Sequence, residues 1–177
     1  MELLNKLKIF KRYEWTIFVI IIFAIFFRIY VFSFGRSLWH DECSLALSLL
    51  DRNIFDYFRP LEHYQCAPAF FMVLSNVLVK LFGLSEYSLR LLPLLSGLVS
   101  LPVFYLLTKS CFKNKLVLLL INILFAFNYQ LISYSQEFKQ YSTDVLIIIL
   151  LLLIFRKIDL FLINKKQFII YALVIGL

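Results

Sequence analysis

The sequence predicts an all-α protein: a polytopic bundle of transmembrane helices with a long first loop on the outer side of the membrane. Hydrophobic residues make up 62% of its 177 residues and charged residues only 16%. A soluble domain typically has about 45–50% apolar and about 25% charged residues, and one soluble core cannot bury so much apolar surface. The composition therefore excludes a soluble globular enzyme and a disordered tail.

The basic excess is the second observation. The formal net charge is +7, but no basic stripe with interleaved aromatic residues lies outside the apolar runs, so nucleic acid is not an expected partner. The three cysteines, Cys43, Cys66 and Cys111, follow neither a zinc-binding nor a disulfide spacing. The lipid bilayer is the partner that this composition indicates.

The first transmembrane helix is expected at residues 15–34. This apolar run is interrupted only by Arg28, which is near enough to the outer end to snorkel or to line a cavity. About 20 helical residues cover about 30 Å, the thickness of the hydrocarbon core, and the run lacks the cleavage site of a signal peptide. The N-terminus is expected in the cytoplasm because four basic residues precede the run: Lys6, Lys8, Lys11 and Arg12.

Residues 67–82 form an apolar run of a different kind. The run contains Pro68 and has Asn76 and Lys80 four positions apart, hence on one face of a helix. If it crossed the membrane, the basic cluster at residues 109–115 would lie outside, against the positive-inside rule. We therefore expect a helix that lies on the outer membrane surface, within an outer loop of residues 35–88.

The remaining helices follow from the same rule, in which each span moves the chain to the other side of the membrane and the basic loops stay in the cytoplasm. Spans are expected at residues 89–107, 116–132 and 141–155, with a second outer loop at 133–140. An apolar run at 167–177 is too short to complete a span, so the chain resembles the N-terminal part of a longer protein. With this topology most of the acidic side chains lie outside: Asp41, Glu42, Asp51, Asp56, Glu62, Glu86, Glu137 and Asp144.

Two adjacent carboxylates, Asp41 and Glu42, follow Trp39 in the first outer loop. In one interpretation Asp41 is the N-cap of an amphipathic helix over residues 43–52, and Glu42 favours the helix dipole. In the other, a carboxylate just outside the bilayer is a general base that takes a proton from an incoming hydroxyl. The two roles are compatible, since a cap also fixes the carboxylate in place.

The second outer loop is a polar segment between two apolar helices. It is either a solvated hairpin tip, with Glu137 and Lys139 as surface charges, or a functional segment. The second interpretation is favoured because Glu137, Gln140 and Tyr141 share one face if the loop is helical. Asp144 is expected at the membrane edge, where a carboxylate is energetically costly unless it is paired or has a function.

Other polar side chains of the outer loops carry weaker signals. His40 and His63 lack the close spacing of a metal site, so ordinary loop histidines are the simpler interpretation. Arg59, Arg90 and Lys139 are outer cations that are able to meet a phosphate, although snorkelling at the interface is their default role.

Four segments resemble, in order, the signatures of the GT-C superfamily of membrane glycosyltransferases. The Trp-His-Asp-Glu run at residues 39–42 is similar to the first-loop acidic motif, and residues 65–68 and 81–93 are similar to the next two signatures. Residues 134–144 are similar to the second-loop motif. The most similar branch is related to dolichyl-phosphate-mannose–protein mannosyltransferases and to lipid A aminoarabinose transferases. Many of its members have Pro-Pro or Lys-Pro where this chain has Ala67-Pro68.

The resemblance implies transfer of a sugar from a polyprenyl-phosphate carrier to an acceptor hydroxyl of a lipid, glycan or protein, on the outer face of the plasma or inner membrane. It makes Asp41 the candidate catalytic base, with Glu42 beside it. A divalent metal ion is the candidate cofactor, with Asp41 and Glu137 as candidate ligands, and metal-independent transfer stays open. The second-loop motif and the donor phosphate are assigned Glu137, Lys139, Gln140, Tyr141 and Arg90.

Two other functions compete with this one. A transporter or flippase subunit would use Glu137 and Asp144 as an ion relay, and it predicts carboxylates deep inside helices and spans broken by Gly and Pro. Here the acids cluster in loops, and the chain has only 4 Gly. An inactive structural remnant is the third possibility.

Overall fold

A computed structural model describes residues 2–50, 52–61 and 65–157, with side chains from residue 13 to residue 156. Every regular element among them is helical, which confirms the all-α prediction. The elements are α1 (Glu2–Phe32), α2 (His40–Leu50), the 3₁₀ helix η1 (Ile54–Phe58), α3 (Ala69–Phe82), α4 (Glu86–Cys111), α5 (Lys115–Ala126), α6 (Tyr129–Tyr134) and α7 (Tyr141–Lys157). The run expected at 167–177 lies outside the described residues.

Two helices in the described part of the chain are long and apolar enough to cross a membrane. They are Tyr13–Phe32 within α1 and the whole of α4, Glu86–Cys111. At 1.5 Å per residue these stretches cover about 30 Å and about 39 Å. Large apolar side chains of α1, among them Phe18, Phe23 and Phe26, are exposed on the bundle surface. An exposed apolar stripe of this kind suits contact with lipid.

The span expected at 116–132 is two helices instead. α5 ends at Ala126, and α6 begins after Asn128, whose side chain accepts a hydrogen bond from the Leu131 amide (3.1 Å). Arg28 of α1 is only 1% exposed and donates from Nη1 to the Ala126 carbonyl (3.0 Å). It does not snorkel, because its guanidinium is buried and donates to a carbonyl that has no intrahelical donor at the end of α5. With 12 residues, α5 alone covers about 18 Å.

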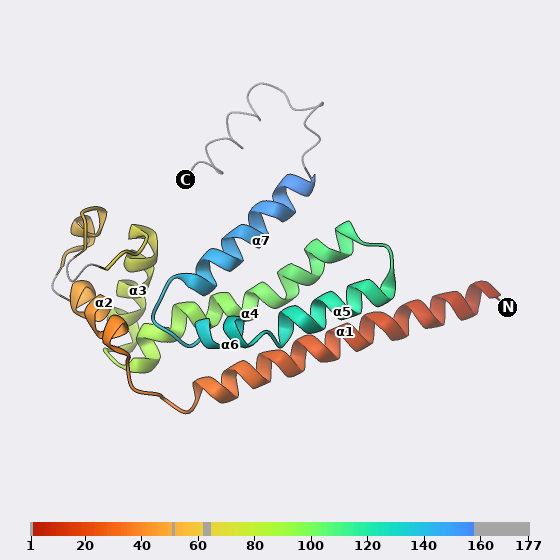
Figure 1. Cartoon of the computed structure of the whole chain (residues 1–177), viewed down its shortest axis with the longest axis horizontal. Helices are drawn as coiled ribbons and strands as arrows, with labels where there is room; N and C mark the ends of the chain where they lie inside the picture. The colour runs from red at the N-terminus through yellow and green to blue at the C-terminus, as the bar shows by residue number, and fades with distance from the viewer. Residues whose placement is uncertain (1, 51, 62–64, 158–177) are drawn as a thin grey trace, which may run out of the picture.

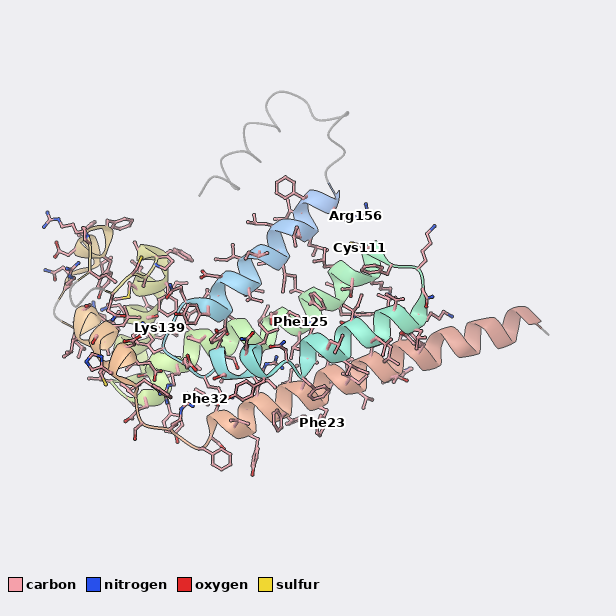
Figure 2. All side chains as sticks on the ribbon, in the orientation of Figure 1. Phe23, Phe32, Cys111, Phe125, Lys139 and Arg156 are labelled. Atoms are coloured by element: carbon pink, nitrogen blue, oxygen red, sulfur yellow. The ribbon has the colours of Figure 1, made fainter. Side chains whose placement is uncertain are left out.

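The two expected outer loops lie at the same end of the bundle. α4 packs against α1, α3, α5 and α7, and Figure 1 shows α2, α3 and the α6–α7 connection gathered at one end of α4, with the α4–α5 turn at the other. In Figure 2, Lys139 lies at the first end, whereas Cys111 and Arg156 lie at the second. There Arg156 donates to the Ser110 carbonyl (3.3 Å). Segments that are far apart in the sequence therefore meet around α2.

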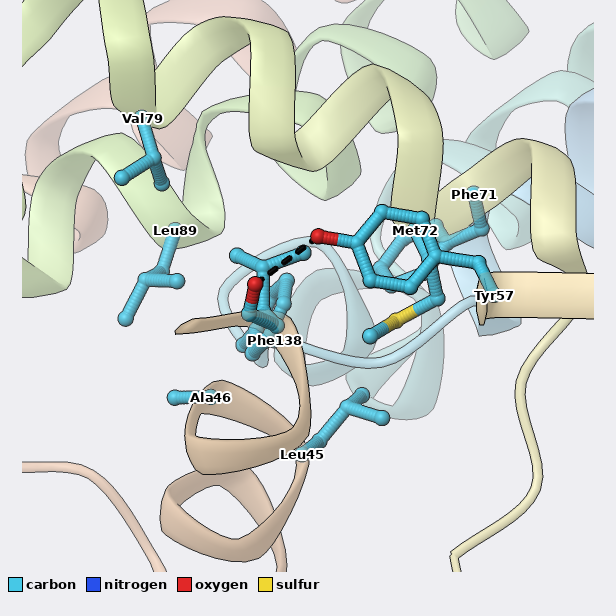
Figure 3. Close-up of a cluster of buried hydrophobic side chains, with 9 residues drawn as sticks. Leu45, Ala46, Tyr57, Phe71, Met72, Val79, Leu89 and Phe138 are labelled. Carbon is cyan, nitrogen blue, oxygen red and sulfur yellow. Dashed lines mark hydrogen bonds between the residues drawn. The ribbon is translucent and has the colours of Figure 1, made fainter. Parts of the chain in front are cut away.

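A buried apolar cluster joins the two loops (Figure 3). Phe138 of the second loop is fully buried, and its ring centroid lies 5.6 Å from that of Phe71 on α3. Burial of one such ring contributes about 1.5–3 kcal/mol, so Phe138 anchors the second loop on the first. The cluster comprises Leu45, Ala46, Leu49, Tyr57, Phe71, Met72, Val79, Leu89 and Phe138.

The start of α4 is fixed by a capping box. The Ser85 hydroxyl accepts a hydrogen bond from the Ser88 amide (3.1 Å), and the Ser88 hydroxyl accepts one from the Ser85 amide (3.0 Å). Two backbone amides that have no hydrogen-bond acceptor within the helix are thereby satisfied. Arg90 follows within the same first turns, so its position relative to α2 is well defined.

Candidate functional site

A buried ion pair between Glu42 of α2 and Arg90 of α4 lies at the centre of the site. Arg90 donates from Nε to Glu42 Oε1 (2.9 Å) and from Nη2 to Oε2 (2.7 Å), a bidentate geometry. The side chains are 4% (Arg90) and 2% (Glu42) exposed. Arg90 also donates to the carbonyls of Arg36 and Ser37. One guanidinium thus ties α4 to α2 and to the connection that follows α1.

The Glu42 carboxylate accepts two further hydrogen bonds from the backbone. The Trp39 amide donates to Oε2 (2.9 Å), and the Phe138 amide donates to Oε1 (2.5 Å). Burial alone would raise the pKa of Glu42, but the bonds from Arg90 and the two amides outweigh burial and hold its pKa below the usual range. With four donors around it, this carboxylate is suited to holding three segments together rather than to exchanging protons.

The prediction that Asp41 is an N-cap is wrong. α2 begins at His40, so Asp41 lies inside the first turn, and the carboxylate that reaches back to the Trp39 amide is Glu42, as in one half of a capping box. The Asp41 side chain is 68% exposed; His40 Nδ1 lies 3.8 Å and the Lys139 ammonium 3.9 Å from its carboxylate oxygens. Asp41 therefore presents its carboxylate outward.

Asp41 lines a pocket of about 400 Å³ that both loops form. The first loop contributes α2 and Trp39, and the second contributes the segment just before α7 together with the first residue of α7. Five of the seven predicted site residues line this pocket, although 100 positions separate the first from the last. The lining residues are Trp39, His40, Asp41, Glu42, Glu137, Lys139 and Tyr141.

The two other predicted site residues lie beside this pocket. Arg90 is behind Glu42 and lines a neighbouring pocket of about 370 Å³; its guanidinium is already bound to Glu42 and to backbone carbonyls. It is therefore not placed as a free cation for a phosphate. Gln140 donates from Nε2 to the Cys66 carbonyl (3.3 Å), a second link between the loops.

The second loop is not helical where a shared helical face was expected. α6 ends at Tyr134, and residues 135–140 form turns and bends. The reason lies in the Phe138 amide, which donates to Glu42 and not to a carbonyl one turn earlier. Glu137 and Tyr141 still reach the same pocket, because the turn brings them there and not because they share a helix.

The charged groups of the second loop are held by specific partners. Glu137 Oε1 accepts a hydrogen bond from the Ser133 hydroxyl (2.8 Å) and lies 3.8 Å from Arg36 Nη2. Lys139 Nζ donates to Gln65 Oε1 (2.7 Å), and its side chain is mostly buried. Sequence reasoning did not single out Arg36 or Gln65 as site residues. Gln65 could have been noticed, since it lies in a segment with the family resemblance.

The donor set for a metal ion is small. Within residues 2–50, 52–61 and 65–157, no group of three or more His, Cys, Asp or Glu side chains could hold a metal ion. Asp41 and Glu137 line one pocket, and two carboxylates fit a divalent cation that takes its other ligands from water and substrate phosphate. His63, the second candidate histidine, lies outside the described residues.

No family model matches the chain, and neither a curated protein nor a solved structure is significantly similar to it. What the site can do therefore follows from its own groups. It offers an exposed carboxylate on Asp41, an ammonium group on Lys139 and two aromatic side chains, Trp39 and Tyr141. These groups suit an electrically charged substrate that carries a ring.

Proposed function

We propose that the protein is a glycosyltransferase of the GT-C type that moves a sugar from a polyprenyl-phosphate carrier to an acceptor hydroxyl. The observation that carries this proposal is the pocket in which Asp41, Glu137 and Lys139 meet, although they come from two separate loops. A base, a second acid and a cation in one pocket are the groups that such a transfer needs.

Asp41 is the general base of the proposed reaction. It takes the proton of the acceptor hydroxyl while that oxygen forms a bond to the anomeric carbon of the sugar. The bond between this carbon and the phosphate oxygen breaks, and the carrier phosphate leaves with the electron pair. The exposure of the Asp41 carboxylate supports this role, because an acceptor hydroxyl has access to it.

Lys139 stabilises the charge of the leaving phosphate. Its ammonium is held by the Gln65 side chain and faces the Asp41 side of the pocket, so it is oriented before substrate arrives, which is the arrangement that makes electrostatic stabilisation effective. Glu137, Gln140 and Tyr141 complete the donor side. A divalent ion, where one is bound by Asp41 and Glu137, would supply further positive charge to the phosphate.

Glu42 and Arg90 are positioning residues in this proposal. Four hydrogen bonds occupy the Glu42 carboxylate, which differs from the expectation of a second catalytic acid beside Asp41. Arg90 differs likewise from the expected phosphate ligand. Their pair holds α2, which carries Asp41, on α4, and the bond from the Phe138 amide to Glu42 holds α2 on the loop that carries Lys139.

The proposed location is a multi-pass protein of the plasma or inner membrane, with a cytoplasmic N-terminus and the pocket on the outer face. Two apolar helices of spanning length support it. So does the division of charge between the ends of the bundle, since Lys109, Lys113, Lys115 and Arg156 lie around the end opposite the Asp41 pocket.

The test is a transfer assay on membranes that contain the protein, with a panel of polyprenyl-phosphate sugars labelled in the sugar. Asp41→Asn is expected to lower turnover by about 10²–10⁴-fold without a change in membrane insertion. Glu86→Gln is the matched control, because Glu86 is an exposed acid of the same loop end that does not line the pocket. Wild-type turnover in Asp41→Asn would remove Asp41 from the mechanism. If the wild type consumes none of the polyprenyl-phosphate sugars, the result favours the transporter alternative.

A further inference from the structure

A groove of about 550 Å³ lies between α1 and α4, at the end of the bundle opposite the Asp41 pocket. Cys111, which ends α4, is labelled at this end in Figure 2. The groove and the Asp41 pocket have no lining residue in common, so the proposed transfer reaction does not use it. The lining residues are Glu14, Trp15 and Phe18 of α1 and Tyr105 and Lys109 of α4.

The groove lies where the apolar stretches of both helices end. The candidate span of α1 begins at Tyr13, and that of α4 ends at Cys111. Trp15 lies two positions inside the first span, and Lys109 lies two positions inside the second. Trp and Tyr side chains gather at this depth of a membrane, at the level of the lipid headgroups. If both helices cross the membrane, lipid headgroups therefore surround the groove.

Two opposite charges in the groove are within reach of a ligand. Lys109 Nζ donates to Glu14 Oε1 (2.6 Å) and lies 5.5 Å from the centroid of the Tyr105 ring. The Lys109 and Glu14 side chains are 47% and 36% exposed. An ammonium group has three N–H donors, and a carboxylate accepts up to about four hydrogen bonds. The pair is therefore able to bind a further acceptor at Lys109 and a further donor at Glu14 while it stays bonded.

The opposite signs of the two charges narrow the class of ligand. An anion alone would be attracted by Lys109 and repelled by Glu14, whereas a phosphate and an ammonium a few atoms apart give each charge its complement. Phosphatidylethanolamine has both groups, and its ammonium donates N–H bonds. Phosphatidylcholine has the same charges without an N–H donor, and phosphatidylglycerol has no cation. Trp15 and Phe18, which are 65% and 53% exposed, add an apolar surface for an acyl chain.

We propose that this groove binds a phospholipid whose headgroup carries a primary amine, of which phosphatidylethanolamine is the simplest. The phosphate accepts a hydrogen bond from Lys109, the ammonium donates one to Glu14, and the acyl chain lies along Phe18. The bound lipid thereby links α1 to α4 at the cytoplasmic end of the bundle. This assignment rests on the proposed location in the membrane and not on the transfer reaction.

The test uses Trp15 as the probe of binding. The chain has 2 tryptophans, so Trp39→Phe leaves Trp15 as the single one. This parent variant, as the full chain in detergent micelles, is titrated with phospholipids that are brominated on the acyl chain, because bromine quenches tryptophan fluorescence on contact. Phosphatidylethanolamine is expected to reach half-maximal quenching at a concentration about tenfold lower than phosphatidylcholine or phosphatidylglycerol, the order of one charge-assisted hydrogen bond.

Two further substitutions locate the headgroup. Glu14→Gln in the parent variant is expected to remove most of the preference for phosphatidylethanolamine over phosphatidylcholine, because the carboxylate that binds the ammonium is lost. Lys113→Gln is the matched control, since Lys113 is an exposed cation of the same end that does not line the groove. It is expected to keep the preference. Glu14 belongs to a partly exposed ion pair, so its replacement has little effect on folding.

The outcomes separate this proposal from the proposed function, because no sugar carrier is present. Equal quenching by phosphatidylethanolamine and phosphatidylcholine in the parent variant overturns the proposal, as does stronger quenching by phosphatidylglycerol. A preference that survives in Glu14→Gln, or that Lys113→Gln reduces equally, overturns it too, since the headgroup is then not bound in the groove. A preference that depends on Glu14 supports the lipid site even if the transfer assay detects no sugar transfer, a result that would count against the transferase alone.

Discussion

Replacement of Arg90 by alanine is expected to be among the most destabilising single changes in the protein. The substitution removes both bonds to Glu42 and the bonds to the Arg36 and Ser37 carbonyls. It leaves the Glu42 carboxylate 2% exposed with only two backbone amides as partners. Loss of one partner from a buried ion pair costs about 3–5 kcal/mol, because the remaining charge is uncompensated.

The assay is unfolding of the detergent-solubilised full chain by heat and by denaturant, with Lys109→Ala as the control. Lys109 pairs with Glu14 at 2.6 Å, but both side chains are more than a third exposed, so its loss should cost about 0–1 kcal/mol. Because the two charges compensate each other, the double variant Glu42→Gln/Arg90→Ala should be less destabilised than the sum of its single variants, by about 0.5–3 kcal/mol. Equal losses in Arg90→Ala and Lys109→Ala would refute the reasoning.

Three further predictions concern the same end of the bundle. The folded-state pKa of Glu42 is lowered, so its stabilising contribution is complete at neutral pH and is lost as the pH falls through that lowered pKa; unfolding midpoints measured from neutral to acid pH should show a loss that Glu42→Gln lacks. Gly97→Ala would place a Cβ 2.6 Å from that of Ser135 and should cost about 1–3 kcal/mol, part of which Ser135→Gly should restore in the same unfolding assay. Phe138→Ala should cost about 3–5 kcal/mol and should increase proteolytic cleavage of the second loop; unchanged cleavage would contradict its anchoring role.

Hydropathy was sufficient to predict α1, α3, α4 and α7, because long apolar runs have few alternatives. The count of membrane spans, combined with the positive-inside rule, placed residues 35–88 and 133–140 on the same side of the membrane. In the structure these two segments contact each other through Glu42 and Phe138. Asp41, Glu137 and Lys139 were selected as charged residues in those two loops. Their common pocket follows from the same topology.

Local conformation and pairing were not predictable in the same way. The break between α5 and α6 depends on Asn128, one of the few polar residues in an apolar run, and on Arg28 from another helix. Likewise the sequence predicted a catalytic role for Glu42 and a phosphate-binding role for Arg90. Their mutual bond needs the packing of α2 on α4 across 48 positions, which no spacing in the sequence expresses.

The bonds of Glu42 also set an order on biosynthesis. Its carboxylate is made long before its partners, since Arg90 follows 48 positions later and the Phe138 amide 96 positions later. While the chain is being inserted, α2 therefore emerges with a hydrated charge, and it becomes able to dock only when α4 is present. The Asp41 pocket closes later still, when the second loop arrives. A nascent chain that stops between those two points would carry a paired but unfinished site.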